Sequence, residues 1–226
     1  SNNSIIINQN ATGTGAGSSG IVFYSSYWAN NNIIKDCMQV SGVTNDVLVP
    51  TSTNVNNTFI NCSYNLSRES VSGAGNYLVR KWYYRAYVND SSGTAVSNAN
   101  VSAYNVSGAT EFTGLFTNST GWTNITTITE YVNTGGTRSY YNNYSLNAIY
   151  SSSIASKSYN VTAVNGTGGV NNNLNDIIAF NSVLSSCGTL SSANTIYTLT
   201  GNVTSNGTCF NVTANNVTLD CSGYAI

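Results

Sequence analysis

One short pattern near both ends of the chain constrains the fold more than any other feature. An asparagine pair, a short apolar stretch, a polar residue and a cysteine follow one another in NNNIIKDC (30–37), NVNNTFINC (54–62) and NNVTLDC (215–221). In the last copy, apolar and polar residues alternate, which is the period of a strand with one buried face. The pattern predicts that both ends belong to one kind of repeating β-structure.

The cysteine spacing indicates which structure this is. Cys37 and Cys62 lie 25 residues apart, and Cys187 and Cys209 lie 22 apart. Such periods, with short strands and Asn/Gly corners, are typical of a parallel β-solenoid, in which no rung buries its inner face without a neighbour. The last strand therefore requires another rung, which a second copy of the N-terminal residues supplies. We expect the 226 residues to be one period of a head-to-tail array, either tandem in one polypeptide or assembled from separate subunits.

Apolar residues near the two ends are the candidate assembly interface. We expect them to add main-chain hydrogen bonds and buried apolar area at each junction, because a head-to-tail contact that does not close into a ring produces a fibre. On the C-terminal side they are Val212, Val217, Leu219 and Ile226, and on the N-terminal side Ile5, Ile7, Ile21 and Phe23. Within the N-terminal rungs, Ile34 and Phe59 lie at matching distances from their cysteines, which predicts that both point inward.

Composition limits the function classes. Only 7% of the residues are charged and the net charge is −1, so electrostatic binding of nucleic acid or of a membrane surface is not expected. One proline, 16 tyrosines and 20 glycines favour an all-β protein. There is no signal peptide, initiator methionine or apolar run long enough to span a membrane, so we expect a mature segment.

Asparagine takes the place of charge, and many asparagines lie in Asn-x-Ser/Thr glycosylation sequons. The chain has 17 sequons, where roughly ten would arise by chance, and a surface with so little charge needs another source of hydration. The alternative is an Asn/Thr-rich β-protein in which sequons are incidental. The candidate sites for N-glycans are Asn2, Asn10, Asn56, Asn61, Asn65, Asn89, Asn100, Asn105, Asn118, Asn124, Asn143, Asn160, Asn165, Asn202, Asn206, Asn211 and Asn216.

Five cysteines without a C-x-x-C metal spacing indicate disulfides in an oxidising compartment. Stacked positions on adjacent rungs lie roughly 4.8 Å apart, within the range of a disulfide. Cys187 with Cys209 is the favoured pair, and Cys37, Cys62 and Cys221 then compete for one bond. A bond from Cys221 of one copy to Cys37 of the next would make the junction covalent. Unpaired buried thiols are the alternative.

A different β-structure is expected in the middle of the chain. Composition changes at Arg68, and Arg68–Gly75 has the composition of a linker. Beyond it, alternating strands with turn signals every 8 to 15 residues indicate a Greek-key sandwich, whose first strand places Trp82 on one face and Lys81 on the other. The predicted organisation is β-helix rungs at 1–67, a sandwich at 68–180 and further β-helix rungs at 181–226.

The residues of this middle segment carry a family resemblance. VNDSSGTAVSNANVSAYN (88–105), TNSTGWTNITTITEY (117–131) and YYNNYSLNAIY (140–150) resemble the carboxypeptidase-regulatory-like, or transthyretin-like, Ig sandwich, with its D-x-x-G-x-x-V-x-x-A-x-V opening. The segment 187–226 resembles the first rungs of right-handed parallel β-helix proteins on archaeal cell surfaces. The resemblance implies an all-β chain with β-helix rungs at both ends, an inserted Ig-like sandwich and an extracellular or cell-surface location.

Catalytic residues are hard to find. Parallel β-helices include polysaccharide lyases, but such sites need converging carboxylates or a calcium-binding acidic cluster with a base. The chain has no histidine, and its eight acids are scattered, with Asp36 and Asp220 before cysteines and Asp46 elsewhere. We therefore expect no catalytic residues, no metal and no cofactor. A cross-link from Lys81 to an asparagine, promoted by Glu130, is a minor alternative to an ordinary surface lysine.

The sequence predicts a non-enzymatic structural glycoprotein, the repeating module of an extracellular filament or cell-surface stalk. Its expected partners are further copies of itself and covalent glycans. One alternative is an adhesin that binds sugars or a partner protein through the sandwich, where Tyr83, Tyr87 and Trp28 would form a stacking surface. The other is a degenerate β-helix enzyme acting on uronate polymers, for which Asp36 would be needed.

Overall fold

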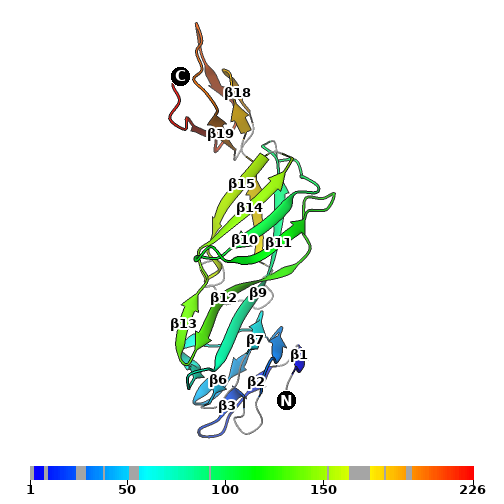
Figure 1. Ribbon diagram of the computed structural model, residues 1–226, viewed down its shortest axis with the longest axis vertical. Coiled ribbons are helices and arrows are strands. Elements are labelled where there is room, and N and C mark those ends of the chain that lie inside the picture. Colours follow the sequence, from blue (N-terminus) through cyan, green and yellow to red (C-terminus); the bar gives the residue numbers. More distant parts are fainter. Residues whose placement is uncertain are drawn as a thin grey trace.

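The computed structural model describes residues 3–7, 10–23, 29–37, 39–50, 56–91, 93–151, 153–162, 174–180, 182–191 and 195–226, and these residues form an all-β structure (Figure 1). The molecule is elongated, with the N-terminus near one end and the C-terminus near the other (Figure 1). We divide it into an N-terminal region (3–76), a central region (77–180) and a C-terminal region (182–226).

The N-terminal region consists of short strands that stack in parallel. The strands form three stacks, in the orders β1-β4-β7, β2-β5 and β3-β6-β8, of which the first is one end of a seven-stranded sheet, and a 3₁₀ helix spans Leu66–Arg68. The strands are β1 (Ile5–Ile7), β2 (Ala11–Thr12), β3 (Ser19–Val22), β4 (Ile33–Lys35), β5 (Val40–Ser41), β6 (Asn45–Val49), β7 (Asn57–Ile60) and β8 (Glu69–Val71). The first two turns of the chain each contribute one strand to every stack and the third contributes β7 and β8, so the turns lie one above another.

The middle residues of β4 and β7 confirm the inward orientation predicted for them. Ile34 pairs with Phe59, and their side chains are 2% and 0% exposed. The flanking residues of both strands are only partly buried, because successive side chains in a strand point to opposite faces. In β1 the residue of the same column is Ile6, which pairs with Ile34. The inward column of the N-terminal turns is therefore Ile6, Ile34 and Phe59.

Arg68–Gly75 is not the linker that its composition suggested. Within it, β8 pairs in parallel with β6, so the N-terminal sheets continue through this segment. Val71 at the end of β8 is 4% exposed and belongs to the same apolar cluster as Phe59. Small polar residues around a short strand give a loop-like composition, and the pairing with β6 is a long-range contact that composition does not reveal.

The central region is built from two sheets that pack around one core. Strands β9, β12, β13 and β16 lie in one sheet and β11-β10-β14-β15 form the other. The strands are β9 (Tyr77–Asn89), β10 (Asn100–Tyr104), β11 (Thr110–Phe116), β12 (Thr126–Thr134), β13 (Thr137–Tyr140), β14 (Tyr144–Tyr150), β15 (Ser153–Tyr159) and β16 (Leu174–Ala179). Inward side chains of both sheets form one cluster that includes Trp82, Tyr84, Val101, Leu146 and Ile178.

Alternation along β9 has the predicted phase, with Trp82 buried and Lys81 only partly buried on the other face. In β14, Leu146 and Ala148 are buried likewise, whereas Tyr150 on the same face of the strand is 46% exposed. Tyr150 is the last residue of β14, and its ring lies against that of Phe180, with 6.5 Å between ring centroids. Burial at strand ends depends on what lies opposite, which the period does not give.

Strand β9 belongs to the N-terminal and central regions at once. Its first part pairs in parallel with β7, from Asn57 opposite Leu78 to Ile60 opposite Lys81. Its second part pairs in parallel with β16, and its other edge pairs in antiparallel fashion with β12. One continuous 13-residue strand therefore joins the two regions, and in Figure 1 it runs from the N-terminal sheets into the central region.

The C-terminal region repeats the parallel stacking on a smaller scale. The strands β17 (Ser182–Leu184), β19 (Ile196–Leu199) and β21 (Thr218–Asp220) form one sheet, and β18 (Gly188–Leu190) and β20 (Phe210–Val212) form another. The buried apolar residues here are Leu190, Tyr197, Leu199 and Val203. Much of the apolar surface of this region thus remains exposed.

Candidate assembly surfaces

Three strands form the N-terminal end of the molecule, and each is the last strand of its sheet in the described part of the chain. They are β1, β2 and β3, which pair with β4, β5 and β6 respectively. Ile5, Ile6 and Ile7 are 61%, 44% and 44% exposed. An exposed edge of parallel strands with apolar side chains is a template for pairing with another chain.

Two of the four residues expected on this surface need correction. Ile5 and Ile7 are exposed as the hypothesis requires, whereas Ile21 is half-buried. Phe23 is buried and packs edge-on against Phe59, with 6.0 Å between ring centroids, so it belongs to the core beneath the surface. The residue that sequence reasoning omitted is Ile6, whose inward position follows from aligning SIII (4–7) with the strand that contains Ile34.

At the opposite end, β20 and β21 are the last strands of their sheets among the described residues. Val212 and Ile226 are each 57% exposed, and Val217 and Leu219 are half-buried. Val212 pairs with the buried Leu190 and so lies on the inward face, but the described chain provides nothing that covers it. Within the described part of the chain, each end of the molecule thus presents a parallel strand edge that pairs with no further strand and carries apolar side chains.

Both ends use the same backbone corner. Each of the strands β1, β4, β7 and β21 pairs with a strand of a neighbouring turn in its own terminal region. Two positions before the first of these paired residues lies an asparagine whose backbone is in the left-handed region. These residues are Asn3, Asn31, Asn56 and Asn216, with φ between 53° and 57°. Asparagine tolerates this conformation better than other residues with a Cβ, which explains the recurring asparagine pairs in the sequence.

Asparagine side chains also connect the N-terminal turns to one another. The Asn57 Oδ1 atom accepts hydrogen bonds from the backbone N–H (3.2 Å) and the side-chain amide (3.0 Å) of Asn32. The Asn32 Oδ1 atom accepts from the N–H of Ser4 at 3.1 Å. Because Asn32 and Asn57 are buried, these bonds satisfy polar groups at the corners that would otherwise be costly to bury.

Two disulfides cross-link stacked turns, one in each terminal region. Cys187 is bonded to Cys209, the pair that the spacing favours, with 4.6 Å between the Cα atoms. Cys37 is bonded to Cys62, with 4.5 Å between the Cα atoms, and Cys221 is a free thiol. The alternative bond between Cys221 and Cys37 of another copy is incompatible with this pairing, since Cys37 is already used and fully buried.

The acids considered for catalysis do not converge. Asp36 accepts hydrogen bonds from the Asn61 amide (3.0 Å) and the Tyr83 hydroxyl (3.1 Å). Asp46 accepts from the backbone N–H groups of Gly42 and Asn65, at 3.1 and 2.8 Å. Both carboxylates therefore hold loops and strands in place.

The third of these acids, Asp220, lies on β21 in the other terminal region, where its side chain accepts the N–H of Ser222 at 2.8 Å. Among the described residues, no group of three or more Cys, Asp or Glu side chains is arranged to hold a metal ion.

Lys81 does not lie beside the acid proposed for a cross-link. Its Nζ atom is 3.2 Å from Glu111 Oε1. Glu130 instead accepts the indole N–H of Trp82 at 2.8 Å and lies 3.4 Å from Arg80 Nη1. Lys81 on β9 thus forms an ion pair with Glu111 on β11 of the other sheet, where the Glu111 side chain is only 8% exposed.

The aromatic residues considered for sugar stacking are already engaged. Tyr83 donates to Asp36, and burial, followed by the charge of that carboxylate, raises the pKa of Tyr83 to about 12. Tyr87 packs on Trp122, with 5.1 Å between ring centroids. Trp28 lies outside the described residues. Tyr83 and Tyr87 therefore serve contacts within the chain.

A buried polar cluster joins the N-terminal and central regions, and sequence reasoning missed it. The Glu69 carboxylate, whose side chain is 0% exposed, accepts hydrogen bonds from Tyr64, Tyr131, Asn133 and Arg138. Burial is the main cause that raises the pKa values of Tyr64 and Tyr131, and nearby charge on Glu69 raises them further. No local pattern signals this cluster, because its members come from sequence positions up to 69 residues away from Glu69.

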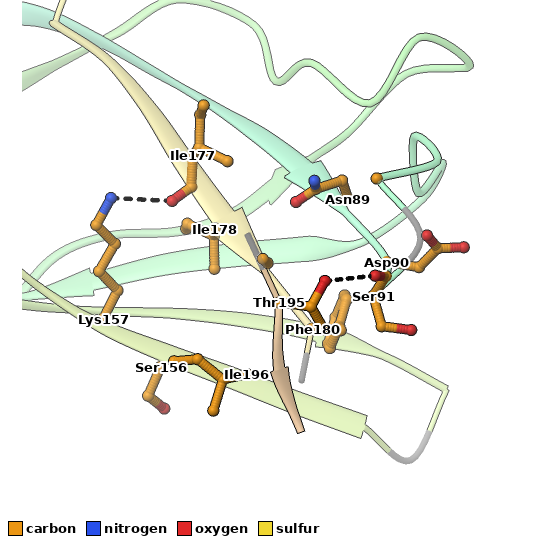
Figure 2. A pocket seen from close by; sticks show the side chains of 12 residues that line it. Asn89, Asp90, Ser91, Ser156, Lys157, Ile177, Ile178, Phe180, Thr195 and Ile196 are labelled. Atoms are coloured by element: carbon orange, nitrogen blue, oxygen red, sulfur yellow. Dashed lines mark hydrogen bonds between the residues drawn. The ribbon is translucent and has the colours of Figure 1, made fainter. Parts of the chain in front are cut away.

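A partly open cavity of about 520 Å³ lies where the central and C-terminal regions meet (Figure 2). Residues from the end of β9, from β15, from β16 and from the start of β19 line it. Lys157 donates to the carbonyl of Ile177 at 2.9 Å, and the Thr195 hydroxyl donates to the carbonyl of Ser91 at 2.8 Å (Figure 2). Lys157 also forms an ion pair with Asp176. The central and C-terminal regions thus meet at a cavity with a few polar contacts, whereas the N-terminal and central regions meet through a packed core.

The sequon asparagines differ widely in accessibility. Asn61 is buried and donates to Asp36, whereas Asn89, Asn100, Asn105 and Asn160 are half-buried. Asn2 and Asn165 lie outside the described residues. The exposed sequon asparagines are Asn10, Asn56, Asn65, Asn118, Asn124, Asn143, Asn202, Asn206, Asn211 and Asn216.

Comparison of the chain with models of known protein families, with curated proteins and with solved structures gives no match. Among the described residues, no helix has the length and apolar character needed to cross a bilayer. Function therefore has to be argued from the residues themselves.

Proposed function

We propose that this chain is a non-enzymatic structural module of an extracellular filament or cell-surface stalk, joined head-to-tail to further copies of itself. The terminal regions are turns of a parallel β-helix, and the central region is an Ig-like sandwich inserted between them. Each turn of a β-helix buries its inner face against the next turn. A module with an open turn at each end is stabilised by the complementary turn of its neighbour, and repetition of this contact gives an open fibre.

The observation that carries this proposal is the presence of matching open edges at both ends. β1 and β21 follow the same left-handed asparagine corner, both pair in parallel on one side only within the described chain, and both carry apolar side chains at the inward position. Ile6 at that position is 44% exposed, although the equivalent residues Ile34 and Phe59 are buried. Burial of such side chains is the main driving force for association.

An extracellular location is supported by the two disulfides, since stable disulfides form in oxidising compartments. We propose that N-glycans occupy exposed sequon asparagines and supply the hydration that a surface with 7% charged residues lacks. Glycopeptide mass spectrometry of the protein from its source tests this directly. Glycans should be found at exposed sites such as Asn124 and Asn206 and not at the buried Asn61.

Sedimentation velocity of the purified 226-residue chain over a concentration series tests the assembly. Oligomers should form and grow with concentration, and electron microscopy should show filaments. Ile6→Asp and Leu219→Asp should each abolish them, because a charge at the inward position cannot be buried at the junction. Ile154→Asp is the matched control, since Ile154 is 66% exposed on the central region and should leave assembly unchanged. A chain that stays monomeric at all concentrations would contradict the proposal.

A further inference from the structure

The structure also contains information on how two copies would meet, because the same backbone hydrogen bond recurs wherever turns stack. The N–H of Ile33 donates to the carbonyl of Ser4 at 2.8 Å, and the N–H of Thr58 donates to the carbonyl of Asn32 at 2.8 Å. In each case the donor lies two residues after the left-handed asparagine, and the acceptor lies one residue after the asparagine of the preceding turn.

The C-terminal region uses the same donor position. The N–H of Thr218, two residues after Asn216, donates to the carbonyl of Thr195 at 3.0 Å. Thr195 immediately precedes Ile196, and Ile196 is the residue paired with Thr218. The acceptor is therefore the residue before the first paired residue of the earlier strand, as it is for Ser4 before Ile5. One rule of register describes both ends of the molecule.

The polarity of the two open edges is complementary. In both regions, each later strand stacks on the preceding strand in the same direction, as β4 on β1 and β21 on β19. A strand that follows β21 would thus add to the edge of β21 that faces away from β19. A strand that precedes β1 would add to the edge of β1 that faces away from β4. In a parallel pair both strands keep one direction, so no reversal of either copy is needed.

We propose that β1 of one copy adds in parallel to β21 of another with Ile5 opposite Thr218, Ile6 opposite Leu219 and Ile7 opposite Asp220. This register rests on the head-to-tail function proposed above and specifies its contact. The N–H of Ile5 then donates to the carbonyl of Val217 of the preceding copy, which repeats the bond made by Ile33 and Thr58.

This register places apolar side chains opposite one another on the inward face. Ile6 meets Leu219 in the inward column, where Ile34 meets Phe59 within the N-terminal region and Tyr197 meets Leu219 within the C-terminal region. A shift by one residue would turn the inward side chains of one copy to the outer face, because the side-chain period of a strand is two. The burial of apolar side chains therefore selects this register over its nearest competitors.

Cysteine cross-linking tests the register. Stacked cysteines in this protein form disulfides at Cα separations of 4.5 and 4.6 Å, so directly opposed residues at the junction fall within reach of a disulfide. In a Cys221→Ser background, which removes the free thiol, a chain carrying Ile5→Cys and a differently tagged chain carrying Thr218→Cys are mixed and oxidised. Non-reducing electrophoresis should show a covalent heterodimer, and mass spectrometry should find the two peptides that carry the introduced cysteines joined by a disulfide.

The matched control replaces Ile5→Cys with Ile6→Cys, whose side chain lies on the opposite face from Thr218, and the covalent heterodimer should be lost. If oligomers form but Ile6→Cys cross-links to Thr218→Cys in preference to Ile5→Cys, the register is wrong while the assembly stands. If the Cys221→Ser parent shows no oligomers by sedimentation velocity, both the assembly and the register are refuted.

Discussion

The N-terminal and C-terminal regions stack their strands in the same way but differ in how well they are packed. In the N-terminal region the inward residues Ile34, Val47 and Phe59 are at most 2% exposed, and the core continues to Leu78 and Tyr131. In the C-terminal region the inward residues Leu190, Tyr197 and Leu199 are also buried, but Leu219 in the last turn is half-buried and Val212, which pairs with Leu190, is 57% exposed. The difference shows that the last turn of a stack keeps its inward side chains accessible unless another layer covers it.

The covering layer of the N-terminal region is the central region itself. Strand β9 adds directly to β7, and the Glu69 cluster ties Tyr64 to Tyr131 on β12. The C-terminal region meets the central region through the cavity of Figure 2 and contacts such as the Thr195–Ser91 hydrogen bond. We expect the N-terminal and central regions to unfold as one unit and the C-terminal region to open separately.

Alkaline pH should produce the largest effect, and it should act on the first unit. Burial raises the pKa values of Tyr64, Tyr84, Tyr131, Tyr144 and Tyr159 above the ordinary value of 10. The unfolded chain releases these protons near pH 10 while the folded chain retains them, so stability falls as pH rises above about 10. Absorbance of tyrosinate at 295 nm should rise cooperatively together with loss of the circular dichroism signal.

A different titration of the tyrosines would contradict the prediction for alkaline pH. Gradual ionisation of all tyrosines near pH 10 with an unchanged fold would show that the tyrosine hydroxyls are accessible. It would also remove the physical basis for the close packing assigned to the N-terminal junction.

Glu69→Ala should be the most damaging single substitution. It leaves Arg138 and two tyrosine hydroxyls without their partner, and removing one member of a buried ion pair costs about 3–5 kcal/mol. Urea denaturation with tryptophan fluorescence measures the loss. Thr195→Val, which removes a hydrogen bond at the other junction, should cost only about 1 kcal/mol. Equal effects at the two junctions would remove the distinction between them.

Replacing Cys187 and Cys209 by alanine should destabilise the C-terminal region alone. The disulfide closes a loop of 22 residues, and loss of such a closure costs about 3 kcal/mol by chain entropy. Hydrogen exchange should then increase in residues 182–226, while protection of β7 and β9 stays unchanged. Increased exchange in β9 would mean that the C-terminal region supports the central region more strongly than its contacts indicate.

A smaller effect than that of Glu69→Ala or of the disulfide replacement is expected at the asparagine corners. Asn31→Ala should cost about 1–2 kcal/mol, because alanine disfavours the left-handed conformation, whereas Asn31→Gly should cost much less. Thermal denaturation of both variants measures this. The same pair of substitutions at Asn216 should show the same order, and a reversed order there would contradict the equivalence of the two corners.

Local patterns predicted much of the secondary structure. Alternation in Tyr77–Val88 correctly gave the buried face of β9, and the cysteine-anchored pattern correctly gave Ile34 and Phe59 as inward residues. Long-range contacts were not predictable: β8 in the supposed linker, the burial of Phe23 and the Glu69 cluster each depend on a partner far away in the sequence. Of the candidate interface, Ile5 and Ile7 were found on the exposed edge, while Ile6 was missed.

The sequence alone determined that the chain is all-β, where its asparagine corners lie and which cysteines are spaced for stacking, because these follow from the conformational preference and period of neighbouring residues. Only the tertiary structure decided which turns are covered. Burial of an inward side chain depends on the layer placed over it. In this protein β9 adds to β7 and Phe59 is buried, whereas Ile6 in β1 and Val212 in β20, each in the last strand of its sheet among the described residues, remain exposed.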